Sequence, residues 1–169
     1  MSVTAAFIQE FEQEAKTTRR VLERVPADKL AWKPHPKSMS LGELALHVAA
    51  SPGVIAGWCT QAETSFTGEK TPAPTTTAEI LSAHDCGVKT VRDSLTEVGD
   101  AGMGTMWTAK AGDATLMKMP KQALVRAIVL NHWIHHRGQL SVYLRLIDVP
   151  VPSIYGPSAD ENPFAAATA

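Results

Sequence analysis

The chain has 169 residues, which suits one domain with a single hydrophobic core, and we take residues 1–169 as that domain. Its 16 basic and 17 acidic residues give a formal net charge of −1, which argues against a nucleic-acid partner. No apolar run approaches the ~18 residues of a membrane span, and the N-terminus lacks the pattern of an export signal. We therefore expect a soluble, cytoplasmic protein with no membrane partner.

The two cysteines, Cys59 and Cys86, lie 27 residues apart and form no C-x-x-C motif. This spacing indicates neither a redox pair nor a zinc site made of thiolates. We expect both to be reduced thiols packed among apolar neighbours.

The first predicted helix covers about residues 2–24. Its apolar side chains recur in steps of three and four, at Ile8, Phe11, Ala15, Leu22 and Val25, with Thr18 in a small-residue position. The segment that follows holds Pro26, Pro34 and Pro36. Because these prolines forbid a continuous helix, this segment is expected to be a loop.

The second helix is predicted to begin at a capping box. Ser40 and Glu43 stand three residues apart before an apolar run, which is the spacing of that motif. The helix should reach about Thr60, and Pro52 and Gly53 mark the place where a kink is expected.

The third helix is predicted to start at Thr76 and Glu79, which repeat the capping signature. Its apolar stripe consists of Leu81, His84, Val88, Val91, Leu95 and Val98. The helix should end before Gly99. The segment after it holds several glycines that indicate turns, and a short β-hairpin around Trp107 and Leu116 is one interpretation of it.

The longest stripe in the chain follows Pro120, a residue well placed at the start of a helix. The stripe consists of Val125, Val129, His132, His136, Gln139, Tyr143 and Ile147. It predicts a fourth helix with the histidines on its inward face. Four prolines between positions 150 and 163 then exclude helix, so the chain should end in an extended arm that contacts the bundle through Ile154, Tyr155 and Phe164.

Four long helices with one long connection predict an all-α fold, a four-helix bundle. The connection, about residues 63–75, separates the second helix from the third. It is longer than a tight helical hairpin needs, which lets these two helices run parallel. Residues 150–169 are the extended C-terminal arm of the predicted bundle.

The strongest functional signal lies in residues 131–140, which hold three of the six histidines. His132 and His136 are four residues apart, so both imidazoles leave one face of a helix and can share a cation. His135 is turned by about 60° to the other side of His132, so it is expected at the surface or behind the ligands. We interpret the pair as part of a metal site.

An imidazole that is buried in an apolar core without a hydrogen-bond partner costs roughly 1–3 kcal/mol of folding free energy. A divalent transition metal bound to the ring nitrogen removes that cost. His47, on the apolar side of the second helix, is the natural third ligand, with His84 of the third helix as its rival. Three neutral imidazoles leave the ion with open positions, which suits hydroxide generation or the binding of a thiolate.

Several residues near the predicted metal site keep more than one interpretation. Gln139 could orient a ligand or bind substrate, and Tyr143 could donate a hydrogen bond or pack in the core. His84, Asp85 and Cys86 cannot form a catalytic triad among themselves, because neighbouring helix residues point about 100° apart.

Three segments carry a family resemblance. They are Trp32-Lys33-Pro34 with Ser38-Met39-Ser40-Leu41-Gly42-Glu43-Leu44-Ala45-Leu46-His47-Val48-Ala49, then His132-Trp133-Ile134-His135-His136-Arg137-Gly138-Gln139-Leu140 with Tyr143-Leu144-Arg145, and Val151-Pro152-Ser153-Ile154-Tyr155-Gly156-Pro157-Ser158. Together they resemble the DinB/YfiT family of metal-binding four-helix bundles, and the resemblance covers nearly the whole chain.

The resemblance implies an up-down-down-up bundle with one metal ligand on the second helix and an H-x-x-x-H pair on the fourth, here His47, His132 and His136. It also implies nickel or zinc as the metal and a homodimer as the assembly. The implied activities are transfer or conjugation with low-molecular-weight thiols, thiol-dependent isomerisation and metal-dependent hydrolysis. The fold alone does not choose among them.

Three functions are consistent with these residues. The leading hypothesis is a metalloenzyme on which an exogenous thiol binds as thiolate and attacks a small electrophilic substrate. The second is a metal-dependent hydrolase, for which Glu43, four residues before His47, is the nearest candidate base. The third is a non-catalytic binding or stress-response protein, which predicts a closed coordination sphere around the metal.

Overall fold

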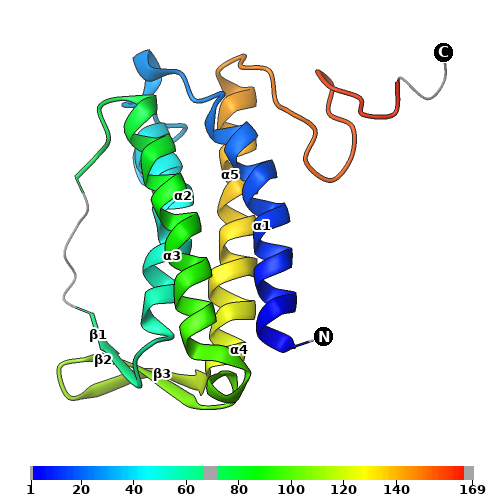
Figure 1. Ribbon diagram of the computed structural model, residues 1–169. Helices are drawn as coiled ribbons and strands as arrows, with labels where there is room; N and C mark the ends of the chain where they lie inside the picture. Colours follow the sequence, from blue (N-terminus) through cyan, green and yellow to red (C-terminus); the bar gives the residue numbers. More distant parts are fainter. Residues whose placement is uncertain (1, 67–71, 166–169) are drawn as a thin grey trace.

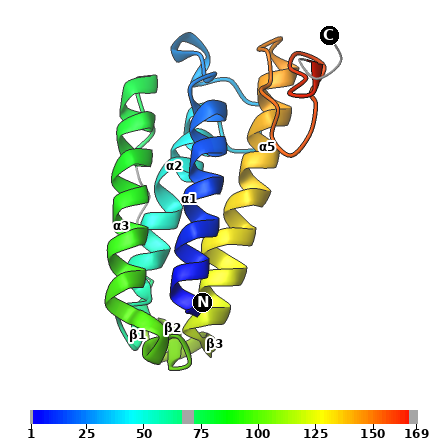
Figure 2. The same ribbon diagram turned by 45° about the vertical axis from the view of Figure 1, so that its right-hand side comes forward.

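Four helical stretches lie side by side in the computed structural model, which describes residues 2–66 and 72–165 (Figure 1). They are α1 (Val3–Leu22), α2 (Leu41–Trp58), α3 (Thr77–Met103) and a last stretch made of α4 (Lys121–Leu124), the π-helical η2 (Val125–Asn131) and α5 (His132–Leu146). A 3-10 turn, η1 (Ala27–Lys29), lies between α1 and α2. Figure 2 shows a second side, and in both views α1 and the last stretch run opposite to α2 and α3. None of the described helices is both long and apolar enough to cross a membrane.

The prediction of an all-α fold is wrong, because a small mixed sheet lies at one end of the helices (Figure 1). Its strands are β1 (Glu63–Ser65), β2 (Met106–Ala111) and β3 (Ala114–Pro120), in the order β1-β2-β3, with β1 parallel to β2 and β2 antiparallel to β3. The hairpin considered around Trp107 and Leu116 is therefore present as β2 and β3. Gly112 supplies the positive φ, 55°, in the short turn between them.

The sheet packs on the helices through aromatic rings. Trp107 of β2 is buried, and its ring lies parallel to that of Trp58 at the end of α2, with centroids 5.8 Å apart. The Trp107 Nε1–H donates to Thr64 Oγ1 of β1 at 3.0 Å, and Phe66 meets the Trp58 ring edge-on at 4.9 Å. These contacts fix β1 against β2 and hold the Trp58 ring in place.

The predicted starts of the second and third helices are confirmed. Ser40 Oγ accepts from the Glu43 N–H at 3.1 Å, and Glu43 Oε2 accepts from the Ser40 N–H at 2.6 Å, which completes the capping box. Thr76 Oγ1 accepts from the Glu79 N–H at 3.1 Å. The third helix does not end before Gly99: this glycine takes a φ of 58°, and helical structure continues beyond it.

The structure describes only part of the predicted long connection between α2 and α3. Residues 67–71 of it lie outside the described residues. Its beginning is strand β1 and not a loop, and its end returns to the helices, where Pro74 is buried beside Gly42 at the start of α2.

The buried face of the last helical stretch differs from the predicted stripe. The buried side chains of α5 are Trp133, Arg137, Leu140 and Leu144. His132 and His136 are only half-buried, and Gln139 is exposed. The cause is η2, because a π-helical turn holds more residues than an α-helical one and so displaces the side chains that follow it around the axis. The histidines therefore lie at the edge of the core and not inside it.

The C-terminal arm, residues 150–165 in the described part, contains no α-helix and no strand. Ile154 packs against the core as expected. The Tyr155 hydroxyl accepts a hydrogen bond from Arg137 at 2.6 Å and donates one to Glu14 at 2.8 Å. Phe164 is exposed and is not among the apolar side chains that pack against the core, so the contact expected of it is not found there.

The two cysteines differ in their surroundings. Cys59 is buried as expected, and burial raises the pKa of its thiol to about 11. Cys86 is exposed on α3, so the expectation that it packs among apolar neighbours is wrong. Neither thiol belongs to a group of potential metal ligands in the described part of the chain.

α2 and α3 approach each other closely where two glycines meet. A Cβ at Gly53 would lie 2.8 Å from the Gly87 Cα and 3.2 Å from the Gly87 carbonyl oxygen. A Cβ at Gly87 would lie 3.0 Å from the Ala49 carbonyl oxygen. Backbone atoms cannot move aside as a flexible side chain can, so this crossing depends on glycine at both positions. It helps to set the position of α2, which carries His47.

We predict that Gly53→Ala lowers the free energy of unfolding by about 1–3 kcal/mol, because the added methyl group would push α2 away from α3. Urea unfolding followed by circular dichroism measures the change. Gly57→Ala on the same helix is the matched control, since no atom lies within 4 Å of a Cβ there, and it should be neutral or stabilise by up to ~1 kcal/mol. Equal stability of the two variants would contradict the close crossing.

Candidate metal centre

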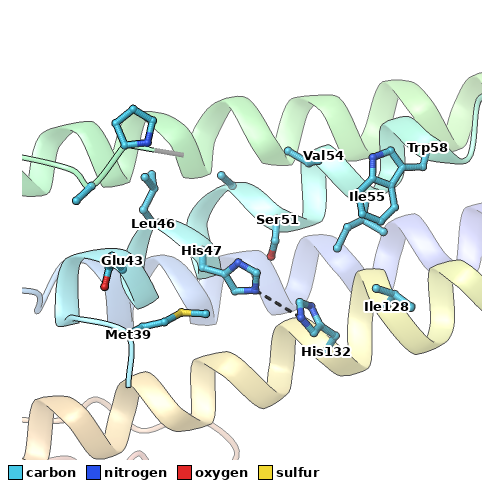
Figure 3. A pocket seen from close by; sticks show the side chains of 13 residues that line it. Met39, Glu43, Leu46, His47, Ser51, Val54, Ile55, Trp58, Ile128 and His132 are labelled. Atoms are coloured by element: carbon cyan, nitrogen blue, oxygen red, sulfur yellow. Dashed lines mark hydrogen bonds between the residues drawn. The ribbon is translucent and has the colours of Figure 1, made fainter. Parts of the chain in front are cut away.

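Three half-buried imidazoles from two helices meet at one point. His47 extends from α2, and His132 and His136 extend from α5. His132 Nε2 lies 3.4 Å from His47 Nε2 and 3.0 Å from His136 Nε2, and one ring nitrogen of each of the three lies within 4.8 Å of the others. Figure 3 shows the His47 and His132 rings pointing toward each other from their separate helices.

The spacing of these nitrogens fits one divalent ion. Metal–nitrogen distances of about 2.0–2.1 Å in tetrahedral geometry place neighbouring ligand nitrogens about 3.3 Å apart. The three rings stand at 83–85° to one another, and their Nε2 atoms face the same small volume. The group could therefore hold a metal ion.

Burial keeps the three imidazoles neutral at physiological pH. Burial and, secondarily, the nearby His136 and His132 lower the pKa of His47 to about 4. Burial is also the main cause that lowers the pKa values of His132 and His136. A metal binds the lone pair of a neutral imidazole, so these groups need not lose a proton to bind an ion at pH 7.

Gln139 is placed to orient His136. Its Oε1 lies 2.6 Å from His136 Nδ1 and, as an acceptor, holds the proton on that nitrogen. The lone pair of His136 is then on Nε2, which faces the cluster. Hydrogen bonds of this kind fix the tautomer and orientation of a ligand and strengthen metal binding. Two roles were considered for Gln139, and this hydrogen bond favours the one in which it orients a ligand over the one in which it binds substrate.

The relative position of α2 and α5 at the cluster is fixed by an indole. The Trp133 Nε1–H donates to the Val48 carbonyl oxygen at 2.8 Å, and both residues are buried. This carbonyl is free because Pro52, four residues later in α2, has no N–H to close the α-helical bond. Trp133 directly follows His132, and Val48 directly follows His47. The bond therefore brings the candidate ligands of the two helices together.

Arg137, one residue after His136, is a buried cation. Its side chain is 1% exposed, and its guanidinium lies 2.6 Å from the Glu14 carboxylate of α1. It also donates to Thr18 Oγ1 at 3.1 Å and to the Tyr155 hydroxyl at 2.6 Å. These bonds resist rotation of α5 and so support the orientation of His136. Hydrophobic periodicity treats a charged side chain as surface, so it misses this residue.

The other candidate residues do not belong to the cluster, although the exposed His135 ring lies beside His136, with centroids 5.0 Å apart. His84 is 3% exposed on α3, where burial lowers its pKa, and it does not belong to the three-histidine group. The alternative of His84 as the third ligand is therefore not supported. His135 is exposed, as expected. Tyr143 has both of the roles considered for it: its ring packs edge-on against Trp32, with centroids 5.7 Å apart, and its hydroxyl donates to the Met39 carbonyl oxygen at 3.4 Å.

Helices with a small sheet at one end, and three histidines able to hold an ion, define a helical-bundle protein with a candidate metal centre. Residues 1–163 match the family model described as the DinB family. The chain belongs to the DinB family, which confirms the resemblance seen in its sequence.

One relative and two solved structures are similar to this chain over most of their length. The chain is 28% identical over 163 residues to the uncharacterized protein YrdA of Bacillus subtilis (strain 168), which covers 92% of this chain and 89% of that protein. A DinB-like protein from Bacillus cereus ATCC 10987 has a TM-score of 0.71 at 24% identity, covering 91% of this chain and 98% of the other. The DinB-like protein YjoA from Bacillus subtilis has a TM-score of 0.67 at 21% identity, with coverage of 86% and 95%. At these identities the two structures show the fold alone.

We predict that Trp133→Phe and Pro52→Ala are energetically coupled. Trp133→Phe removes the donor to the Val48 carbonyl and should cost about 1–3 kcal/mol for the unpaired group, in addition to the lost packing. In a Pro52→Ala background the alanine N–H can close the helical bond to that carbonyl, so the same change should cost about 1 kcal/mol less. Chemical denaturation of the four proteins measures the coupling, and additivity within ~0.3 kcal/mol would count against it.

We predict that His136→Ala lowers the affinity for zinc or nickel by more than about 100-fold, because a ligand loss should exceed the loss of an orienting contact. Metal analysis of protein purified without an affinity tag measures the bound ion. His135→Ala is the matched control, since its exposed ring lies outside the three-histidine group, and it should keep the metal. Full metal content in the His136 variant would show that this ligand assignment is wrong.

Proposed function

We propose that this chain is a metal-dependent enzyme in which His47, His132 and His136 hold a zinc or nickel ion and a low-molecular-weight thiol is presented to a small electrophile. The observation that carries the proposal is the convergence of three neutral imidazoles, two of which line a pocket of about 540 Å³ (Figure 3). Membership of the DinB family, whose resemblance implies thiol-dependent chemistry, supports it.

The number of ligands matters for this proposal. Three protein ligands leave at least one coordination position for an exogenous group. Because His47 and His132 line the pocket, a molecule in the pocket would lie beside that position. A divalent ion held there would lower the pKa of a thiol bound to it and present the thiolate at neutral pH.

The proposed step is attack of the thiolate sulfur on an electrophilic carbon. The sulfur supplies the electron pair of the new bond, and the leaving group departs with the pair of the bond that breaks. In an isomerisation no group leaves: the sulfur adds to one carbon of a double bond, the electron pair of that double bond moves into the substrate, and its return expels the sulfur and regenerates the thiol. The chain contributes by holding His136 through Gln139, by fixing His47 against His132 through the buried indole, and by excluding water with the apolar pocket wall.

A hydrolase mechanism with Glu43 as base has less support. The Glu43 carboxylate accepts from the Ser40 N–H at 2.6 Å and lies 3.5 Å from the Lys33 ammonium. The hydrogen bond from the Ser40 backbone is the main cause that lowers the pKa of Glu43. A carboxylate with a lowered pKa is a weaker general base, and the helix cap would have to break before Glu43 could take a proton from water.

A purely structural metal site also has less support. Structural zinc sites are almost always closed by four protein ligands, whereas the described residues offer three at this point. The pocket beside them gives room for an exogenous molecule. The homodimer and the cytoplasmic location stay predictions.

We predict that cobalt-loaded protein develops sulfur-to-cobalt charge-transfer absorption when it is titrated with cysteine, glutathione or 2-mercaptoethanol. A thiolate in the open position is the physical reason, and near-ultraviolet spectroscopy is the measurement. His136→Ala should abolish the absorption, and His135→Ala should retain it. If protein that demonstrably holds cobalt shows no such absorption with any thiol, the thiol mechanism is wrong.

A further inference from the structure

The pocket beside the histidines is bounded mainly by apolar side chains of α2, together with Met39, Pro72 and Ala73 of the connecting segments and Ile128 of η2. Its lining comprises Met39, Glu43, Leu46, His47, Ala50, Ser51, Val54, Ile55, Trp58, Pro72, Ala73, Ile128 and His132. Figure 3 shows the histidines toward the middle of this lining and Trp58 toward one end. Most of the protein surface that a molecule bound here contacts is therefore carbon.

The charge of this lining disfavours an anionic ligand. None of the described residues that line the pocket is Lys or Arg, and Glu43, its one carboxylate, is held by Ser40 and Lys33. Beside Trp58, away from the ion that the histidines would hold, a carboxylate, phosphate or sulfonate would lose its water without gaining a cationic side chain. An uncharged ligand avoids that cost.

The end of the pocket is a rigid aromatic wall. Trp58 lines the pocket, and its ring is held parallel to Trp107 at an interplanar angle of 3° and edge-on by Phe66. The small sheet, which was not part of the predicted all-α fold, therefore helps to shape the pocket, because Trp107 of β2 holds the Trp58 ring in place. A flat ring on the ligand would find an offset or edge-on partner at this wall.

Ser51 supplies a second and independent sign of a ligand. Its side chain is 9% exposed, it lines the pocket, and its Oγ is buried without a hydrogen-bond partner among the described residues. Ser51 lies one helical turn after His47, and Figure 3 draws its hydroxyl on the side of α2 where the His47 ring lies. An unpaired buried hydroxyl costs roughly 1–3 kcal/mol, and a polar group of a bound ligand would remove that cost.

We propose that the electrophilic substrate of this site is an uncharged, largely aromatic molecule, whose ring lies toward Trp58 and whose single polar group pairs with the Ser51 hydroxyl. The proposal rests on the function proposed above and names the class of substrate. It follows from three features of the lining: no cationic side chain among residues 2–66 and 72–165, a fixed indole, and one unpaired hydroxyl close to the metal ligands.

The first test compares two dyes that differ by one sulfonate, N-phenyl-1-naphthylamine and 8-anilinonaphthalene-1-sulfonate. Fluorescence titration of the full-length protein, treated with a chelator so that no metal ion can bind the sulfonate, should show at least about ten-fold tighter binding of the uncharged dye, because the sulfonate would be desolvated without a partner. Equal or tighter binding of the anionic dye would overturn the proposal.

Two valines make a matched pair of variants for locating the dye. Val54 lines the pocket and Val142 of α5 does not, and both are 56% exposed. Val54→Arg should reduce the preference for the uncharged dye by at least about three-fold, because it adds a cation at the pocket. Val142→Arg should leave the preference unchanged. The same response in both variants would show that the dye binds elsewhere and would overturn the proposal.

The role of Ser51 is tested with 2-naphthol and 2-methylnaphthalene, which have similar shapes and differ in one hydroxyl. In the wild-type protein 2-naphthol should displace the uncharged dye about three- to ten-fold more effectively, as expected for one net hydrogen bond. Ser51→Ala should remove that advantage, and an unchanged advantage would overturn the assignment. These readouts use no thiol, so they can fail while the thiolate absorption of the proposed function succeeds, and the reverse.

Discussion

The hydrogen bond from the Trp133 indole to the Val48 carbonyl is the contact on which the geometry of the histidine cluster depends. Pro52 leaves that carbonyl without its helical partner, and a buried carbonyl without a donor is costly. α5 can therefore pack on α2 favourably only where the indole reaches the carbonyl. In that arrangement His132, which precedes Trp133, faces His47, which precedes Val48. The stability of the core thus selects the register in which the imidazoles meet.

The other side of α5 fixes its rotation. The Trp133 ring stacks on Phe11 with centroids 4.7 Å apart, and Arg137 pairs with Glu14, so α1 holds α5 at two successive turns. The π-helical η2 just before α5 supplies the change of phase that turns these two side chains, and not the histidines, into the interior. The imidazoles consequently lie at the border between core and pocket, positioned by contacts that they do not make themselves.

Local signals in the sequence are enough for the helices and for the candidate ligands. Capping pairs such as Ser40 with Glu43 mark helix starts, and the spacing of His132 and His136 places two imidazoles on one face. Features that depend on distant parts of the chain leave no such signal. Strand β1 has three residues and pairs with β2 across all of α3, and η2 has no hydrophobic period that distinguishes it from an α-helix. For this reason the sequence predicted an all-α fold, and it placed His132 and His136 on the buried face of the last helix where the structure has Trp133 and Arg137.

The central claim is that imidazoles from α2 and α5 share one ion, and X-ray absorption spectroscopy of the zinc-loaded protein tests it most directly. We expect three imidazole nitrogens at about 2.0–2.1 Å from zinc, with one or more non-protein light atoms completing the shell. His132→Ala should reduce the imidazole contribution. A spectrum of the wild-type protein with fewer than three imidazoles, or one that His132→Ala leaves unchanged, would contradict the account.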